Sequence, residues 1–197
     1  MKRLSVISLG LLIGSTIMGC SSMPFGQTDS GWITLFDGSS LDNWNRIGDA
    51  NWRLEGGLAQ ADKGNGFLVS KNSYTDFQIK AEFWVDADAN SGIFIRCSDP
   101  HKVTATNAYE VNIFDKRPDP TYGTGAIVNV AKPSTFIKAG GQWNTYEITA
   151  KGAEFTVTLN GIRTVDGVQD AKLVSGPIAL QYAAGVVKFR KVQIRPL

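Results

Sequence analysis

Short stretches of alternating apolar and polar residues run along most of the chain, and the clearest covers residues 77–85. Every second residue there is apolar, whereas Lys80, Glu82 and Trp84 fall between them. Successive side chains of a β-strand point to opposite faces, so this pattern predicts a strand with one buried face. Similar short runs at 146–149, 155–159, 162–165, 177–182 and 187–194 predict further strands.

Turn signals separate these runs at short intervals. Asn160-Gly161 joins two of them, and Lys151-Gly152 and Glu55-Gly56-Gly57 stand at corresponding places between others. Asn-Gly between alternating runs is the strongest short hairpin signal, because both turn residues need positive φ. Ten or more strands cannot form one flat sheet, so the sequence predicts an all-β fold of two stacked antiparallel sheets.

One predicted strand, at residues 109–115, carries several polar side chains that can act together. Tyr109, Val111 and Ile113 can enter the core while Glu110 and Asn112 share the opposite face. A bulge near Ile113 or Phe114 would return Asp115 to that same face. A carboxylate, an amide and a second carboxylate would then line up on one strand.

The first 19 residues have the pattern of a secretory signal peptide. A positive start is followed by an apolar run that is too short for a membrane span and is interrupted by Gly and Ser. The run ends at Cys20 and resembles the lipobox of bacterial lipoproteins, which implies cleavage after residue 19 and lipidation of Cys20. The alternative is an ordinary signal peptide followed by a cysteine by chance. Ser21 after the cysteine favours sorting to the outer membrane, and residues 20–30 read as a polar tether.

Composition narrows the class of protein. Without residues 1–19 the chain has 18 Lys and Arg against 18 Asp and Glu, so no basic excess indicates nucleic acid binding. Residues 31–197 have a suitable length for one domain with a substantial core. With Cys20 lipidated, Cys97 has no cysteine partner, and we expect it to be a small buried residue.

Several short motifs occur in order over nearly all of residues 31–197. They are Leu35-Phe36-Asp37-Gly38, Leu41-Asp42-Asn43-Trp44, Asn90-Ser91-Gly92-Ile93-Phe94-Ile95-Arg96, Tyr109-Glu110-Val111-Asn112-Ile113-Phe114-Asp115, Gly125-Ala126-Ile127, Trp143-Asn144, Leu159-Asn160-Gly161, Leu180-Gln181 and Phe189-Arg190. Together these motifs resemble the 3-keto-disaccharide hydrolase domain family. The resemblance implies a concanavalin A-like jelly-roll sandwich, export, and action on glycosides whose sugar carries a 3-keto group.

The chain departs from the family pattern at three places. Family members commonly have Gln where Asn112 stands and an aromatic residue where Val128 stands. They also carry His-Gly after the Leu-Gln pair, whereas this chain reads Tyr182-Ala183-Ala184-Gly185. If the family's chemistry needs that histidine, this protein has lost the function or uses Tyr182 for it.

A 3-keto sugar can lose its C1 substituent by elimination, because the ketone acidifies the proton at C2. The reaction needs a base, a positive group at the developing enolate oxygen and an acid at the leaving oxygen. We assign Glu110 as the base and Arg96 as the enolate stabiliser, with Asp115 or Tyr182 as the acid. We assign no cofactor, and a divalent metal ion is an alternative to Arg96. The structural alternative is a Glu110–Arg96 ion pair between neighbouring strands.

The spacing of Glu110, Asn112 and Asp115 also resembles the Glu-x-Asp-x-x-Glu strand of retaining jelly-roll glucanases. The middle acid is an amide here, and Asp is one methylene shorter than Glu. The shorter side chain would widen a carboxylate gap of about 5 Å in retaining enzymes, so direct hydrolysis by this pair is disfavoured.

Sugar rings are commonly bound by aromatic faces next to carboxylates and amides. We therefore predict substrate binding by Asn112, Gln181, Trp84, Glu82 and Phe114. The alternative for the two aromatic residues is packing against a loop. The remaining tryptophans, Trp32, Trp44, Trp52 and Trp143, are expected in the core or at its rim.

Two further loops carry polar residues without a clear site. The segment 86–90 lacks the Gly and Glu positions of an EF-hand, and His101 is expected to face solvent. The sequence thus predicts a lipid-anchored envelope protein that binds and cleaves 3-keto-glycosides. The alternatives are a non-catalytic carbohydrate-binding lipoprotein and, less favoured, a module that holds a peptide or protein.

Overall fold

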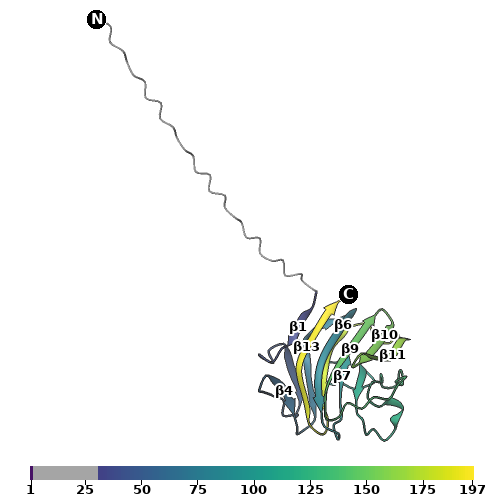
Figure 1. Cartoon of the computed structure of the whole chain (residues 1–197). Helices are drawn as coiled ribbons and strands as arrows, with labels where there is room; N and C mark the ends of the chain where they lie inside the picture. The colour runs from purple at the N-terminus through teal and green to yellow at the C-terminus, as the bar shows by residue number, and fades with distance from the viewer. Residues whose placement is uncertain (2–30) are drawn as a thin grey trace. The chain divides into compact units, whose positions relative to one another are not determined.

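The computed structural model describes Met1 and residues 31–197, and residues 31–197 form one compact unit (Figure 1). The predicted signal peptide, lipidation site and tether lie outside the described residues. Among the residues that the structure describes, no helix is long and apolar enough to cross a membrane.

The larger sheet contains eight antiparallel strands. In spatial order, seven of them are β11 (Ile162–Gln169), β10 (Glu154–Leu159), β9 (Trp143–Lys151), β6 (Phe77–Val85), β13 (Val187–Pro196), β4 (Leu58–Ala61) and β3 (Arg53–Glu55). The eighth, β1 (Ile33–Phe36), pairs with β13. Figure 1 shows β13, β6 and β9 side by side, as the register requires.

The smaller sheet contains five antiparallel strands. Their order is β2 (Trp44–Gly48), β5 (Gly66–Tyr74), β12 (Gly176–Tyr182), β7 (Ser91–Ile95) and β8 (Tyr109–Ile113). A short 3₁₀ helix, η1 (Pro120–Tyr122), follows β8 in the connection to β9.

The core lies between the two sheets and follows the alternation in the sequence. In β6 the apolar residues Phe77, Ile79 and Phe83 are completely buried, as their spacing predicts. The three apolar residues of β8 join the same cluster. The predicted fold, a two-sheet antiparallel jelly-roll sandwich, is therefore confirmed.

The hairpin turns are also where the sequence places them. Asn160 and Gly161 between β10 and β11 have φ angles of 52° and 80°, which are the values that an Asn-Gly turn provides. Gly56 and Gly57 join β3 to β4 with φ angles of 58° and 75°. These turns bring consecutive strands of the larger sheet into register.

Candidate functional site

Glu110 and Asn112 lie on the outer face of the smaller sheet. Tyr109, Val111 and Ile113 on the same strand belong to the core, so the predicted division of β8 into two faces is confirmed. The strand pairs with β7 without a register shift, which places Asn112 opposite Gly92. The register between β7 and β12 brings Gln181 to the other side of Gly92.

The Glu110 carboxylate leans over Gly92. A Cβ atom added at Gly92 would lie 3.3 Å from Glu110 Cγ and 3.4 Å from Glu110 Oε1. A glycine at this position therefore leaves the space that the carboxylate occupies. The result is a small polar cluster in which Glu110, Asn112 and Gln181 surround a backbone without a side chain.

Burial changes the acidity of Glu110. Its side chain is 8% exposed, and removal from water raises the pKa to about 7, with the positive charge of Arg117 acting in the opposite direction. Among the described residues, the carboxylate has no hydrogen bond or salt bridge to replace the lost water. A carboxyl group whose pKa lies near neutrality can accept a proton at physiological pH and release it again.

Two amide oxygens of the cluster also lack partners within the described part of the chain. Asn112 Oδ1 and Gln181 Oε1 are buried and accept no hydrogen bond. The Asn112 amide is oriented by its nitrogen, which donates a 2.6 Å hydrogen bond to the backbone carbonyl of Tyr122. A buried polar atom without a partner costs stability, and a ligand hydroxyl group can supply the missing donor.

The chain after β8 closes one side of this cluster. Residues 125–128 run along the free edge of β8, where Val128 N donates to Glu110 O at 3.0 Å and Asn112 N donates to Ala126 O at 3.0 Å. Phe114, a predicted substrate-binding residue, is half-buried, and its backbone N–H donates to Thr124 Oγ1. The turn of the chain therefore holds Phe114 directly after the strand that carries Glu110 and Asn112.

Arg96 does not join this cluster, so the predicted pairing with Glu110 is wrong. The residue follows β7 with a φ of 54°, and its guanidinium group lies 5.2 Å from the Phe155 ring. It donates hydrogen bonds to the carbonyls of Thr75, Gly152 and Leu173 and forms a 3.1 Å salt bridge with Asp76. The left-handed backbone turns the side chain into the interior, where it joins three loops.

The Asp115 carboxylate is also bound by groups of the protein itself. The strand β8 ends at Ile113 without the expected bulge. The Asp115 carboxylate accepts hydrogen bonds from Thr124 Oγ1 at 2.6 Å, Ala139 N at 2.9 Å and Gly140 N at 2.8 Å. The structure therefore assigns Asp115 to loop anchoring and does not line it up with Glu110.

Tyr182 points into the core, on the side of β12 opposite to Gln181. Its ring packs edge-on against Trp52 at 6.5 Å, and its hydroxyl donates to Gly185 O at 3.0 Å. Burial raises its pKa above the ordinary value for tyrosine. The expectation that Tyr182 replaces the family histidine beside Glu110 is therefore wrong.

Trp84 and Glu82 lie on the outer face of the larger sheet, on the other side of the sandwich. The Lys188 ammonium lies 4.7 Å from the Trp84 ring centre, and Glu82 forms a salt bridge with Arg190. Their predicted place in one groove with Glu110 is wrong, because β6 and β8 belong to different sheets.

The remaining candidates divide between core and surface. Trp44 and Trp52 are buried in the core, Trp143 is 37% exposed, and Cys97 is buried with a pKa raised to about 12 by desolvation. His101 is exposed and lines a separate hollow of about 730 Å³ between β2, β5 and the start of β12. Within residues 31–197, no three His, Cys, Asp or Glu side chains cluster as metal ligands.

Sequence reasoning missed two residues of the site. Gly92 was recognised only as part of a motif, although a glycine inside an apolar strand indicates close approach of another group. Arg117 lies in a polar connection, and no periodicity in the sequence indicates that its charge acts on Glu110.

The double-sheet jelly-roll sandwich is an architecture that lectin domains use. The model of the 3-keto-alpha-glucoside-1,2-lyase-like domain family matches residues 31–195. The chain therefore belongs to this family.

Solved structures share the fold of this chain. Two proteins of Parabacteroides distasonis ATCC 8503, each designated a "putative glycosyl hydrolase", align with TM-scores of 0.73 and 0.70 at 20% and 25% identity. The alignments cover 85% and 84% of this chain and 94% and 99% of the two relatives. The carbohydrate binding module CBM66 from Bacillus subtilis aligns at 0.60 with 18% identity, covering 77% of this chain and 94% of the module. A search of curated protein sequences finds no match.

Proposed function

We propose that this protein binds 3-keto-glycosides at the outer face of the smaller sheet and cleaves them by elimination, with Glu110 as the base. The observation that carries the proposal is the desolvated Glu110 carboxylate, which has a pKa of about 7 and lies between two amides with unpartnered oxygens. The match to the family supports the choice of substrate class, and the desolvation of Glu110 supports the choice of chemistry.

The proposed reaction transfers one proton and breaks one bond. The Glu110 carboxylate takes the proton from C2, next to the ketone, and the electron pair forms the enolate. The enolate then forms the C1=C2 double bond as the C1–O bond breaks. The leaving oxygen receives the proton back from Glu110, which gives an enone and an alcohol. Water can add to the double bond afterwards and complete a net hydrolysis.

Arg117 takes the role that the sequence assigned to Arg96. Its positive charge is the one that acts on Glu110, whereas the Arg96 guanidinium is fully committed to internal partners. A cation near the base stabilises the enolate, in which negative charge develops. The unpartnered oxygens of Asn112 and Gln181 accept hydrogen bonds from sugar hydroxyls and orient the ring.

A divalent metal ion remains the alternative source of positive charge. The oxygens of Glu110, Asn112 and Gln181 are of the type that hard cations prefer, but Glu110 is the only carboxylate among them. We therefore assign the protein-borne charge of Arg117 to this role, and assays with and without added divalent metal separate the two.

A C2-deuterated substrate gives the sharpest test. The protein produced as residues 21–197, which contains the complete sandwich, is incubated with a 3-keto-α-glucoside, and the enone and the alcohol are quantified. We expect turnover with a primary isotope effect, and at least about a hundredfold loss of kcat/KM in Glu110→Gln. Trp84→Ala, on the opposite face of the sandwich, is the matched control and keeps wild-type kinetics. Turnover that survives Glu110→Gln contradicts the assignment of the base.

A second candidate function is carbohydrate binding without catalysis. It is favoured by one observation: Tyr182, Arg96 and Asp115 all turn inward, which leaves Glu110 without a second acid on its face. This candidate predicts that 3-keto-glycosides bind the wild-type protein and are recovered unchanged. Their binding should be weaker in Asn112→Ala. Absence of both binding and turnover would exclude both functions.

We also propose that the protein is exported and anchored by lipid at Cys20, in the outer membrane of a bacterium with two membranes. The support is the sequence alone: an apolar run that ends at a cysteine, followed by Ser21. Anchoring at this position would place the described unit, residues 31–197, at the cell envelope.

A further inference from the structure

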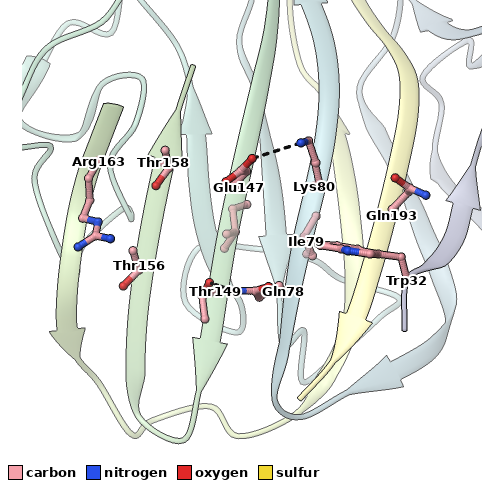
Figure 2. A pocket seen from close by; sticks show the side chains of 11 residues that line it. Trp32, Gln78, Ile79, Lys80, Glu147, Thr149, Thr156, Thr158, Arg163 and Gln193 are labelled. Carbon is pink, nitrogen blue, oxygen red and sulfur yellow. Dashed lines mark hydrogen bonds and ion pairs between the residues drawn. The ribbon is translucent and has the colours of Figure 1, made fainter. Parts of the chain in front are cut away.

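A second hollow lies on the outer face of the larger sheet, on the other side of the sandwich from Glu110 (Figure 2). Its volume is about 400 Å³. The lining residues are mostly polar and come from β13, β6, β9, β10 and β11, with Trp32 from the segment before β1. None of these residues belongs to the Glu110 cluster.

The register of the sheet builds the floor of this hollow as two parallel rows. One row passes through Gln193, Lys80, Glu147, Thr158 and Arg163. The other passes through Gln78, Thr149 and Thr156, and continues on β13 at Arg195, which lies beside the hollow. Neighbouring strands lie roughly 4.8 Å apart, so the floor extends about 19 Å from β13 to β11. Hydroxyl, amide and charged groups therefore face outward continuously over five strands.

Trp32 forms one end of the hollow. The Arg195 guanidinium lies 5.1 Å from the Trp32 ring centre and donates a hydrogen bond to Gln78, whose amide nitrogen donates to Thr149 Oγ1 at 3.3 Å. Figure 2 shows the indole extending across the sheet toward Ile79. The ring is thus held in place beside the polar rows, and an aromatic face in this setting is suited to the apolar face of a sugar ring.

The charges of Lys80 and Arg163 are balanced by acidic partners on the surface itself, whereas the Arg195 guanidinium is held against Trp32 and Gln78. Lys80 and Glu147 lie 3.4 Å apart, and Arg163 pairs with Asp166 at 2.9 Å. These pairs leave little uncompensated charge on Lys80, Glu147 and Arg163 to attract a strongly anionic or cationic ligand. A neutral ligand with many hydroxyl groups can instead donate and accept along both rows.

We propose that this hollow is a second carbohydrate site, which binds a neutral oligosaccharide across β13, β6, β9, β10 and β11. Trp32 stacks against one sugar ring, and Gln78, Thr149, Thr156 and Thr158 bind the hydroxyl groups of the following rings. The length of the floor suits a chain of several rings better than a single sugar. The site is independent of Glu110, since the two lie on opposite outer faces of the sandwich.

Direct titration of residues 21–197 by calorimetry tests the proposal. The probes are maltohexaose, cellohexaose, laminarihexaose and chitohexaose. We expect at least one to bind, and Trp32→Ala to weaken its binding about tenfold or more. The double variant Thr149→Val/Thr158→Val, which removes two hydroxyls from an exposed face, should weaken it as well. Trp143→Ala, an exposed tryptophan on the same sheet outside the hollow, is the matched control and keeps wild-type affinity.

Several outcomes would overturn the proposal. One is that none of the four oligosaccharides binds. Another is that an oligosaccharide binds but that its affinity is unchanged in Trp32→Ala and in the threonine variant. Trp32-dependent dimerisation in sedimentation, with no oligosaccharide bound, would instead assign the hollow to contact between copies of the chain. Loss of oligosaccharide binding in Glu110→Gln would show that the probe binds at the smaller sheet, which would overturn the second site. Because the reaction at Glu110 is tested separately with a 3-keto-α-glucoside, a failure of the second site is distinguished from a failure of the proposed reaction.

Discussion

The hydroxyl group of Tyr146 on β9 donates a 2.6 Å hydrogen bond to the backbone carbonyl of Asn112 on β8. The same hydroxyl accepts a 2.8 Å hydrogen bond from Gly125 N. Tyr146 is completely buried, and its ring stacks on Phe83 at 5.1 Å. A side chain of the larger sheet therefore crosses the core and fixes the strand that carries Glu110.

Replacing Tyr146 with Phe should lower the free energy of unfolding by about 1–2 kcal/mol, the usual effect of losing buried hydrogen bonds. The ring still fills its place, and Gly125 N keeps its bond to Asn112 O, so the fold should persist. Urea unfolding followed by tryptophan fluorescence measures the difference. Lys116→Ala, which removes an exposed salt bridge to Asp88, is the control and should stay within about 0.5 kcal/mol. Equal stability of Tyr146→Phe and the wild type would contradict this role.

Strand alternation predicted the core correctly but could not tell which sheet each strand joins. In β6 and β8 alike, the period of two separates a buried face from an outer one. The outer faces of Trp84 and Glu110 nevertheless lie on opposite sides of the sandwich, because β6 pairs with β13 and β9 whereas β8 pairs with β7. Such pairings depend on contacts between residues distant in sequence, which periodicity does not contain.

Alternation also failed to predict the orientation of side chains just beyond the ends of strands. Continued alternation from Phe94 would place Arg96 on the outer face beside Glu110. The φ of 54° at Arg96 instead turns its side chain inward. Asp115 similarly lies beyond the last residue of β8 and follows the loop. The family motif identified these positions as important, and the structure shows that both stabilise loops.

Arg96→Lys should therefore reduce stability without removing the proposed chemistry. A lysine amine cannot reach the carbonyls of Thr75, Gly152 and Leu173 and also pair with Asp76, so buried acceptors lose their donors. We expect a loss of about 2–4 kcal/mol in the free energy of unfolding, measured in urea. The folded fraction at low temperature should keep the kcat/KM of the wild type for a 3-keto-α-glucoside. A stable Arg96→Lys variant without turnover would indicate that Arg96 takes part in the reaction.

Cys20→Ser should release the protein from the membrane. We expect the wild type, expressed in a bacterium with two membranes, to take up a labelled fatty acid and to sediment with membranes. The variant should do neither, because serine cannot carry the lipid of a thioether-linked anchor. Cys97→Ser, which changes the buried cysteine of the sandwich, controls for labelling at the other thiol. Labelling that persists in Cys20→Ser would support an ordinary signal peptide.

The pKa of Glu110 links the site to stability. Its value rises from 4.5 in the unfolded reference to about 7 in the folded protein, because burial disfavours the charged form. Well below pH 4.5 the group is neutral in both states and imposes no penalty. As pH increases from 4.5 to 7 the unfolded chain ionises first, so stability falls, and well above pH 7 the loss is complete. The full penalty is about 3 kcal/mol.

Glu110→Gln should therefore stabilise the protein in a pH-dependent way. The amide resembles the neutral acid, so we expect similar unfolding free energies for variant and wild type at pH 4. At pH 8 the variant should be more stable by up to about 3 kcal/mol. Urea unfolding at both pH values measures this, with the exposed Glu147→Gln as a control that stays within about 0.5 kcal/mol. The same ionisation should make kcat/KM rise with pH around 7, so the charge that destabilises the fold is the one that the proposed base requires. A Glu110→Gln variant that is no more stable at pH 8 than at pH 4 would contradict the desolvation of this carboxylate.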